Sequence, residues 1–340
     1  MLTIDQLSHS LTKPFVLSLA AFLLSMLLTP IYSNFAYKHK LWKRPRTHSA
    51  TGEELVVIAK QRIKRQIPLM AGLVILVSVA VVTLLFNLNR NQTWLPLAAL
   101  VGGGAVGLID DVINVRGKGG RVAGLRAPLK FAMVFAVAAI GAWFFCYKLG
   151  FNTIHLPHWG DVKLGRGIIA LFILVLVSTA NAVNITDGVD GLAGGLTVYA
   201  YGAFGIIAAL QNNFGIAAFC FTVVGALLSY LWFNIPPARF LMGDVGSFAL
   251  GISLGVVAML TNTVLLLPLI GLVFVAEAGS VLLQIFSKKV FHRRIFISSP
   301  LHHHFEAKGW PKTKVTMRFW VIGQVAATLG VVLALIGHYI

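Results

Sequence analysis

Acidic side chains at the ends of apolar segments are the first candidates for chemistry. The stretch "GLIDDVIN" places Asp110 and Asp111 side by side where one apolar segment ends, and "FLMGDVGS" places Asp244 where another begins. Acids inside or beside membrane segments are costly and usually functional. Paired like charges call for a divalent cation or a basic partner, so a binding site is predicted. A polar helix end and a helix N-cap are the structural alternatives.

A second polar pattern follows another apolar segment in "NAVNITDGVDGLAGG". Asn181, Asn184, Asp187 and Asp190 recur every three residues, so on a helix they would share a face. The glycines between and after them let the backbone turn tightly and approach a ligand closely. An ordinary polar loop would also be rich in glycine, but the regular spacing favours a binding site.

Three consecutive histidines, residues 302–304, stand in the stretch "PLHHHFEAKGW". Three imidazoles could hold zinc, but consecutive side chains on a regular helix or strand point in different directions. Lys308, Arg293 and Arg294 are close in sequence and favour a phosphate-rich anion over a cation. We therefore expect this loop to contact substrate phosphates and not to form a zinc site.

Together, these groups favour one kind of chemistry. Acids at several segment ends suit Mg²⁺, which prefers carboxylates, water and substrate phosphates. Basic residues on neighbouring loops could meet the phosphate oxygens that a metal leaves uncovered. The sequence therefore predicts metal-assisted transfer of a phospho-group from a soluble donor to a lipid phosphate.

The elements that must position these residues are membrane helices. Of the 340 residues, 57% are apolar and only 11% are charged, and the mean hydropathy is +0.83. Soluble domains are about 25% charged, so residues 1–340 are interpreted as a single polytopic membrane domain. The net charge of +17 is assigned to cytoplasmic loops and anionic lipid surfaces, with no nucleic-acid partner expected.

The apolar segments predict an all-α fold of about ten transmembrane helices. The expected spans are residues 14–35, 67–87, 94–113, 128–149, 167–185, 196–211, 215–233, 244–261, 263–286 and 317–338.

The positive charges predict how this fold lies in the membrane. Four loops, at residues 36–66, 114–130, 234–243 and 287–318, contain 23 of the 28 Lys and Arg residues. The positive-inside rule places these loops in the cytoplasm. Both termini then lie on the outer side, and the acids and histidines gather at the cytoplasmic face. Glu277, inside the ninth span, is assigned no role from the sequence, and a helix–helix contact is its structural alternative.

The motifs in their order resemble those of the phospho-N-acetylmuramoyl-pentapeptide transferases (the MraY family). This family belongs to the polyprenyl-phosphate N-acetylhexosamine-1-phosphate transferase superfamily. The resemblance covers about residues 100–320, and the three-histidine loop followed by "FEAKGW" is more similar to this family than to the sugar-only members. It implies ten transmembrane helices and a location in the bacterial inner membrane.

The activity that the resemblance implies is Mg²⁺-dependent. It is transfer of phospho-N-acetylmuramoyl-pentapeptide from its UDP donor to undecaprenyl phosphate, giving lipid I and UMP for peptidoglycan synthesis. The implied partners are the UDP donor, the lipid phosphate and the bilayer, and a homodimer is left open.

The resemblance also implies roles for individual residues. Asp110 is expected to act on the lipid phosphate as base or nucleophile. The residues expected to be catalytic are Asp110, Asp111, Asp244 and His303; those expected to bind substrate are Lys130, Asn184, Asp187, Asp190, Asn234, His302 and His304; and those expected to bind metal are Asp244 and Asp187.

The sequence departs from the family pattern at three places, one of which is Leu241, directly before Met242, where the family usually has a phenylalanine. Asn114 stands where the family usually has a lysine three residues after the acidic pair, and Arg116 or Lys118 is a candidate replacement. The early TPTMGG-like motif appears as "IPLMAG" at residues 67–72, without either threonine. These departures bear on donor specificity more than on the core chemistry.

Two other functions remain open from the sequence. The first is a related transferase that moves another N-acetylhexosamine-1-phosphate to a polyprenyl phosphate. The second is a transporter, because intramembrane acids also mark ion pathways. Transporter sites lie near the bilayer midplane, often between inverted repeats, whereas the acids here are expected at one surface.

Overall fold

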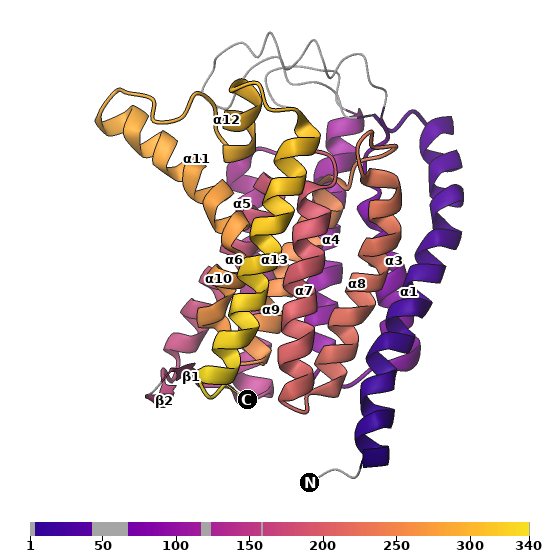
Figure 1. Ribbon diagram of the computed structural model, residues 1–340, viewed down its shortest axis with the longest axis vertical. Helices are drawn as coiled ribbons and strands as arrows, with labels where there is room; N and C mark the ends of the chain where they lie inside the picture. Colours follow the sequence, from indigo (N-terminus) through magenta and orange to yellow (C-terminus); the bar gives the residue numbers. More distant parts are fainter. Residues whose placement is uncertain (1–3, 43–66, 117–123, 158, 340) are drawn as a thin grey trace.

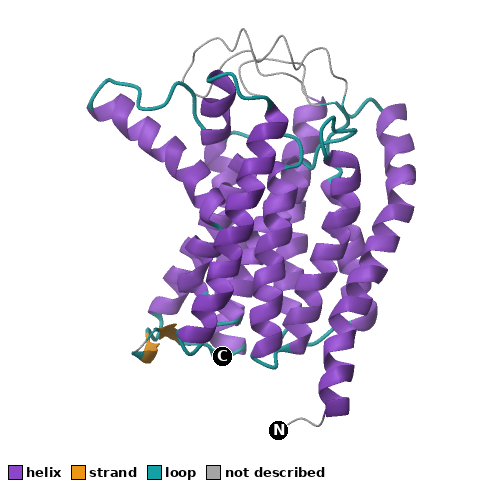
Figure 2. Ribbon diagram, in the orientation of Figure 1, coloured by secondary structure: helices purple, strands orange, loops and turns teal. Residues whose placement is uncertain are grey.

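The structure, a computed structural model, describes residues 4–42, 67–116, 124–157 and 159–339. Most of this chain is helical (Figures 1 and 2). The helices are α1 (Ile4–Lys38), α3 (Gly72–Phe86), α4 (Trp94–Arg116), α5 (Ala127–Trp143) with its π-helical extension η1 (Phe144–Lys148), α6 (Gly167–Thr186), α7 (Leu192–Leu210), α8 (Phe214–Asn234), α9 (Gly243–Leu260), the 3₁₀ turn η2 (Val264–Leu266), α10 (Leu267–Ile270), α11 (Leu272–Val290), α12 (Leu301–Ala307) and α13 (Lys312–Ile336).

The lengths of these helices suit a membrane protein. Within the described residues, eight helices are long and apolar enough to cross a bilayer, namely α1, α4, α5 with η1, α6, α7, α8, α9 and α13. The segments Val264–Ile270 and Leu272–Val290 would add a ninth, bent by 81° at a break. Helix α3 is apolar but only 15 residues long. Each predicted span thus coincides with a helix or a broken helix, and the membrane-helical class is confirmed, while the count of ten stays a prediction.

Figure 1 shows the helices side by side in one bundle, with the N-terminal end of α1 and the C-terminus at the same end. Helix α12 lies at the opposite end. Helix α11 tilts outward from the bundle as it runs to that end. A short antiparallel hairpin, β1 (Thr153–Leu156) and β2 (Gly160–Lys163), was not expected from the sequence. It lies near the C-terminus, where His155 Nε2 is 3.1 Å from the carbonyl oxygen of Gly337.

Helix α9 forms the centre of the bundle, and 94% of its residues are buried. Helix α4 packs against it at unusually short range. A Cβ added at Gly107 would lie 2.1 Å from the carbonyl oxygen of Asp244, and one at Gly103 would lie 2.7 Å from that of Phe248. Small residues let membrane helices approach closely, so the "VGGGAVG" run of α4 brings the end of that helix against the start of α9.

The outer helices expose apolar side chains, as a lipid-facing surface requires. Leu27 on α1 is 70% exposed and Val321 on α13 is 65% exposed. In contrast, nearly every side chain of α9 is buried. This gradient from a buried central helix to apolar outer helices agrees with a chain that folds inside a bilayer.

Main-chain hydrogen bonds join the "IPLMAG" segment to the loop before α9. The N–H of Leu241 donates to Pro68, the N–H of Ala71 donates to Leu241, and the N–H of Gly72 donates to Met242, all at 2.8–3.0 Å. This pairing fixes the backbone immediately before Asp244. Because it uses main-chain groups, this pairing does not depend on the side chains of the segment.

Candidate active site at the end of the bundle

Three carboxylates meet where α4 ends and α9 begins. Oxygen atoms of Asp110, Asp111 and Asp244 all lie within 4.8 Å of one another. Asp110 and Asp111 are each only 2% exposed, and the side chain of Asp244 is 15% exposed. The close contact of α4 with α9 at Gly107 therefore converts two separate sequence motifs into one acidic site.

Lys130 on α5 offsets part of this negative charge. Its Nζ lies 3.0 Å from Asp110 Oδ2 and 2.6 Å from Asp244 Oδ2. The N–H of Leu125 also donates to Asp110 Oδ1 at 2.7 Å. Buried charges need such partners, so Lys130 is the basic group that the sequence called for beside the paired acids.

Hydrogen bonds from neighbouring helices orient the remaining carboxylate oxygens. The main-chain N–H of Val245 donates to Asp111 Oδ2 at 3.0 Å. Asn184 Nδ2 on α6 donates to Asp244 Oδ1 at 3.0 Å and to Ser247 Oγ at 2.8 Å. Asn184, expected to bind substrate, therefore lies beside the acids and bonds Asp244, whereas Ser247 is a supporting residue that sequence reasoning missed.

The donor set of this site fits Mg²⁺. It consists of carboxylate oxygens, the ligands that Mg²⁺ takes from proteins, and no His or Cys belongs to the cluster among the described residues. Asp187, expected as a metal ligand beside Asp244, is not part of that three-acid group. It is the C-cap of α6, one turn after Asn184.

The predicted residues Asn234 and Asp190 hold two loops together beside the acids. The N–H of Gly191, whose φ is +77°, donates to Asn234 Oδ1 at 2.8 Å, and Asn234 Nδ2 donates to Phe240 O at 2.8 Å. Asp190 Oδ2 accepts from the N–H of Ala238 at 3.2 Å. In this structure Asn234 and Asp190 thus fix the turn at residues 187–191 against the loop at residues 235–242.

Two residues of α13 hold the same turn and were missed by sequence reasoning. Thr316 Oγ1 donates to the carbonyl oxygen of Asp190 at 3.1 Å, and Trp320 Nε1 donates to that of Gly191 at 3.1 Å. Both residues lie in the stretch "KTKVTMRFW", in which the sequence had suggested no role for either of them. Only the folded chain shows that α13 reaches the turn.

His302 is buried and pairs with an acid from α11. Its N–H lies 3.0 Å from Glu277 Oε1, and its Nδ1 lies 2.9 Å from Glu277 Oε2. The exposed fractions are 1% for His302 and 0% for Glu277. Glu277 therefore contacts a neighbouring helix, which was its structural alternative in the sequence, and its partner is one of the three histidines.

The other two histidines point elsewhere, because residues 301–307 form a helix. His303 Nδ1 lies 2.6 Å from Glu306 Oε2, and the N–H of Ile297 donates to His304 Nδ1 at 3.1 Å. Burial raises the pKa of Glu306, but the hydrogen bond and charge of His303 outweigh it and hold that pKa below its ordinary value. Desolvation and the nearby Lys308 lower the pKa of His304. The three rings thus have three different partners.

A cavity of about 390 Å³ opens beside Lys130. It lies between α5 and α6, and apolar side chains dominate its lining, which consists of Ala127, Pro128, Lys130, Phe131, Val134 and Asn181. A groove with one cationic end and apolar walls suits a phosphate with a hydrocarbon tail. The predicted Asn181 lies in this lining and not in the acidic cluster.

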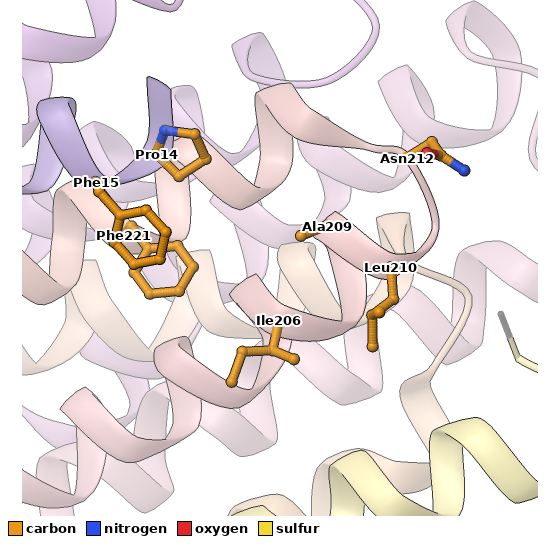
Figure 3. A pocket seen from close by; sticks show the side chains of 7 residues that line it. All are labelled: Pro14, Phe15, Ile206, Ala209, Leu210, Asn212 and Phe221. Carbon is orange, nitrogen blue, oxygen red and sulfur yellow. The ribbon is translucent and has the colours of Figure 1, made fainter. Parts of the chain in front are cut away.

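A second cavity, of about 360 Å³, lies away from the acids and is shown in Figure 3. Its lining comes from α1, α7, α8 and the turn after α7, and the rings of Phe15 and Phe221 lie 5.2 Å apart. No titratable side chain lines it. This cavity offers no group for phosphoryl chemistry.

Two of the three departures from the family pattern have different structural settings. Asn114 is 4% exposed, and its Oδ1 has no hydrogen-bond partner within the described chain. Arg116 is exposed at the end of α4, and Lys118 lies outside the described residues. The "IPLMAG" segment contacts the loop before α9 through its backbone, as described above.

Comparison with known proteins gives the same family as the motifs. The sequence model of glycosyl transferase family 4 matches residues 93–262. A phospho-N-acetylmuramoyl-pentapeptide-transferase of Chloroflexus aurantiacus is 39% identical over 344 residues, covering 97% of this chain and 92% of the relative. A protein of the same name from Bacillus mycoides is 40% identical over 321 residues, covering 92% and 94%. The chain therefore belongs to the phospho-N-acetylmuramoyl-pentapeptide-transferase family and is a multi-pass transferase of the bacterial inner membrane.

Proposed function

We propose that this protein transfers phospho-N-acetylmuramoyl-pentapeptide from its UDP donor to undecaprenyl phosphate in peptidoglycan synthesis. The products are lipid I and UMP. The observation that carries the proposal is the group of Asp110, Asp111 and Asp244 at one end of a membrane bundle, two of which pair with Lys130. The names of the relatives support the transferred group.

The proposed reaction requires Mg²⁺, for which the acidic site offers suitable oxygen ligands. Asp244 would hold the ion together with Asp110 and Asp111, and Asp187 is proposed as a further ligand from the adjacent turn. Bound there, Mg²⁺ would supply positive charge against the diphosphate of the donor.

In the reaction, an oxygen of the lipid phosphate forms a bond to the phosphorus that carries the sugar. The bond from that phosphorus to the oxygen of UMP breaks, and UMP leaves with the electron pair. Asp110 is proposed to act on the lipid phosphate, and Lys130, which already contacts Asp110 and Asp244, provides a fixed positive charge for it. The cavity beside Lys130 is the proposed approach of the lipid.

The remaining predicted residues are assigned to the donor. His302, His303 and His304, with Asn184, Asp190 and Asn234, are proposed to surround its uridine and phosphates. We propose that this end of the bundle faces the cytoplasm, that the chain crosses the bilayer ten times, and that both termini lie outside. The clustering of 23 of the 28 Lys and Arg residues in four loops supports this orientation.

Purified protein in lipid vesicles tests the proposal. With labelled UDP-N-acetylmuramoyl-pentapeptide, undecaprenyl phosphate and Mg²⁺, we expect a labelled lipid and one UMP per transfer, and no product after chelation. Product formed only from UDP-N-acetylglucosamine would instead establish the related sugar transferase. Absence of product from both donors would contradict transferase activity on these substrates.

A further inference from the structure

Glu277 is a fully buried acid that the proposed chemistry does not use. It lies on α11, outside the three-acid cluster, and its two oxygens meet the N–H and the ring Nδ1 of His302 at 3.0 and 2.9 Å. A buried carboxylate in a membrane helix is costly unless it is paired. Here both of its oxygens serve one residue, so the pair joins α11 to the first turn of α12.

The ionisation of Glu277 determines the protonation pattern of the ring. An ionised carboxylate only accepts hydrogen bonds, so with Glu277 ionised Nδ1 of His302 carries the proton between the two groups. The other nitrogen, Nε2, is then unprotonated and can accept a hydrogen bond from a different partner. Carboxylate–histidine pairs fix the tautomer and orientation of an imidazole in this way.

The Nε2 atom of His302 is buried and has no hydrogen-bond partner within the described chain. It points at Gly188, where an added Cβ would lie 2.2 Å from it. Gly188 belongs to the turn that carries Asp187 and Asp190, beside the acidic site. An unpaired polar atom buried at this contact is aimed at the part of the protein where the donor is proposed to bind.

We propose that Glu277 is a positioning residue for the transfer reaction. It acts through His302, holding the ring with Nδ1 protonated and Nε2 directed at the turn of residues 187–191, where Nε2 accepts a hydrogen bond from a hydroxyl or N–H group of the donor. This inference rests on the proposed function, since the donor is the molecule that Nε2 is positioned to contact.

A variant of a neighbouring residue on α11 serves as the control that distinguishes a positioning role of Glu277 from a purely structural one. Gln284 is also buried, and it pins the same connection between α11 and α12 by bonds to the main chain of Ile295 and Phe296 at 3.0–3.1 Å. It touches no histidine in these bonds. The variant Gln284→Ala therefore removes a comparable anchor of this connection without disturbing the ring of His302.

Steady-state kinetics of Glu277→Gln is the first test. The amide oxygen can still accept the N–H of His302 while its NH₂ donates to Nδ1, so the contact is kept but the tautomer is reversed. We expect kcat to fall roughly 10- to 100-fold, as for other carboxylate–histidine pairs, with the thermal midpoint nearly unchanged. Gln284→Ala should lower kcat less than about threefold, and Glu277→Asp should recover part of the loss.

A double variant shows whether Glu277 acts through His302. Glu277→Gln in a His302→Ala background should be no slower than His302→Ala alone, because residues in one network are not additive. Multiplicative losses, or full activity of Glu277→Gln, would overturn the proposal. Wild type and Gln284→Ala must be active in the same assay, so failure of the proposed function is seen separately.

The ring itself gives a readout that does not need turnover. In protein labelled with ¹⁵N-histidine, the resonances missing from His302→Ala identify His302. We expect a protonated Nδ1 in the wild type and a protonated Nε2 with bare Nδ1 in Glu277→Gln. A bare Nδ1 in the wild type would refute the positioning role, even if Glu277→Gln failed to fold.

Discussion

At the scale of residues, the positive charge of Lys130 explains how three carboxylates can lie close together in the acidic site. Like charges brought together in a site of low dielectric repel strongly. The Nζ of Lys130 bonds Asp110 and Asp244 at once, and main-chain N–H groups serve Asp110 and Asp111. The acidic site is therefore preorganised to receive positive charge and phosphate without an unpaired carboxylate at its centre.

We expect Asp244→Ala to remove nearly all transfer activity. A metal at such a site contributes several kcal/mol to the transition state, and each ~1.4 kcal/mol is tenfold in rate, so a loss of about a hundredfold or more follows. The measurement is UMP release at ordinary Mg²⁺. Asp161→Ala, on the distant hairpin, is the matched control and should keep its activity. Near-normal turnover of folded Asp244→Ala would show that Asp244 only stabilises the start of α9 and does not hold a metal.

Asp110→Asn should slow turnover while leaving the donor affinity intact. Asparagine can still accept from the N–H of Leu125, so the local fold is kept. It is a poor base or nucleophile toward the lipid phosphate, and loss of such a group costs about 10²- to 10⁴-fold. Calorimetric titration with the UDP donor and single-turnover kinetics separate the two effects. A large loss of donor affinity with near-normal turnover would show that Asp110 serves the donor instead.

At the scale of elements, close packing and main-chain pairing assemble the site. The glycine run of α4 could be read from the sequence, but not that Gly107 would lie against the carbonyl oxygen of Asp244. Likewise, residues 67–72 and 241–242 were visible as separate stretches, and their pairing was not. Local patterns predict where helices begin and end, whereas contacts between segments more than 100 residues apart depend on the whole packing.

Asn234 is expected to support the site by joining two elements. Its amide bonds Gly191 N–H and Phe240 O, and removing a buried hydrogen-bonding group costs about 1 kcal/mol per bond or more, so Asn234→Ala should lower stability by about 2 kcal/mol. The turn at residues 187–191 should then loosen, and turnover should fall with it.

Asn87→Ala is the matched control for that variant. Asn87 is also 3% exposed and donates to a main-chain oxygen, that of Gly215, at 2.8 Å, but it caps α3 away from the acidic site. Thermal unfolding and kcat of both variants should show a stability loss in each and a marked activity loss only in Asn234→Ala. Equal activity losses would mean that Asn234 has no special connection to the site.

At the scale of the whole molecule, the apolar segments carried most of the predictable information. Burial in lipid demands long apolar helices, so their positions follow from composition. Residue types and spacing then gave the acids and the histidines, and the family resemblance added Lys130. The bend of 81° before α11 and the partner of Glu277 did not follow. Both depend on how polar groups are satisfied in the folded bundle, for which a single sequence has no periodic signal.

The orientation of the bundle can be tested with single cysteines in a background where Cys146 and Cys220 are changed to Ala. Lys163 lies on the hairpin that contacts the C-terminal end of the chain, and Lys289 lies at the end of α11 that leads to the histidines; both are exposed. From the excess of Lys and Arg in the loops on the α12 side, we propose that this side faces the cytoplasm. A membrane-impermeant maleimide should therefore label Lys163→Cys in intact cells and label Lys289→Cys only after permeabilisation.

Both variants should retain transfer activity, which shows that the labelled protein is folded. The reverse labelling pattern would place the acidic site outside the cell, where a soluble cytoplasmic nucleotide donor could not reach it, and the proposed reaction would fail with it.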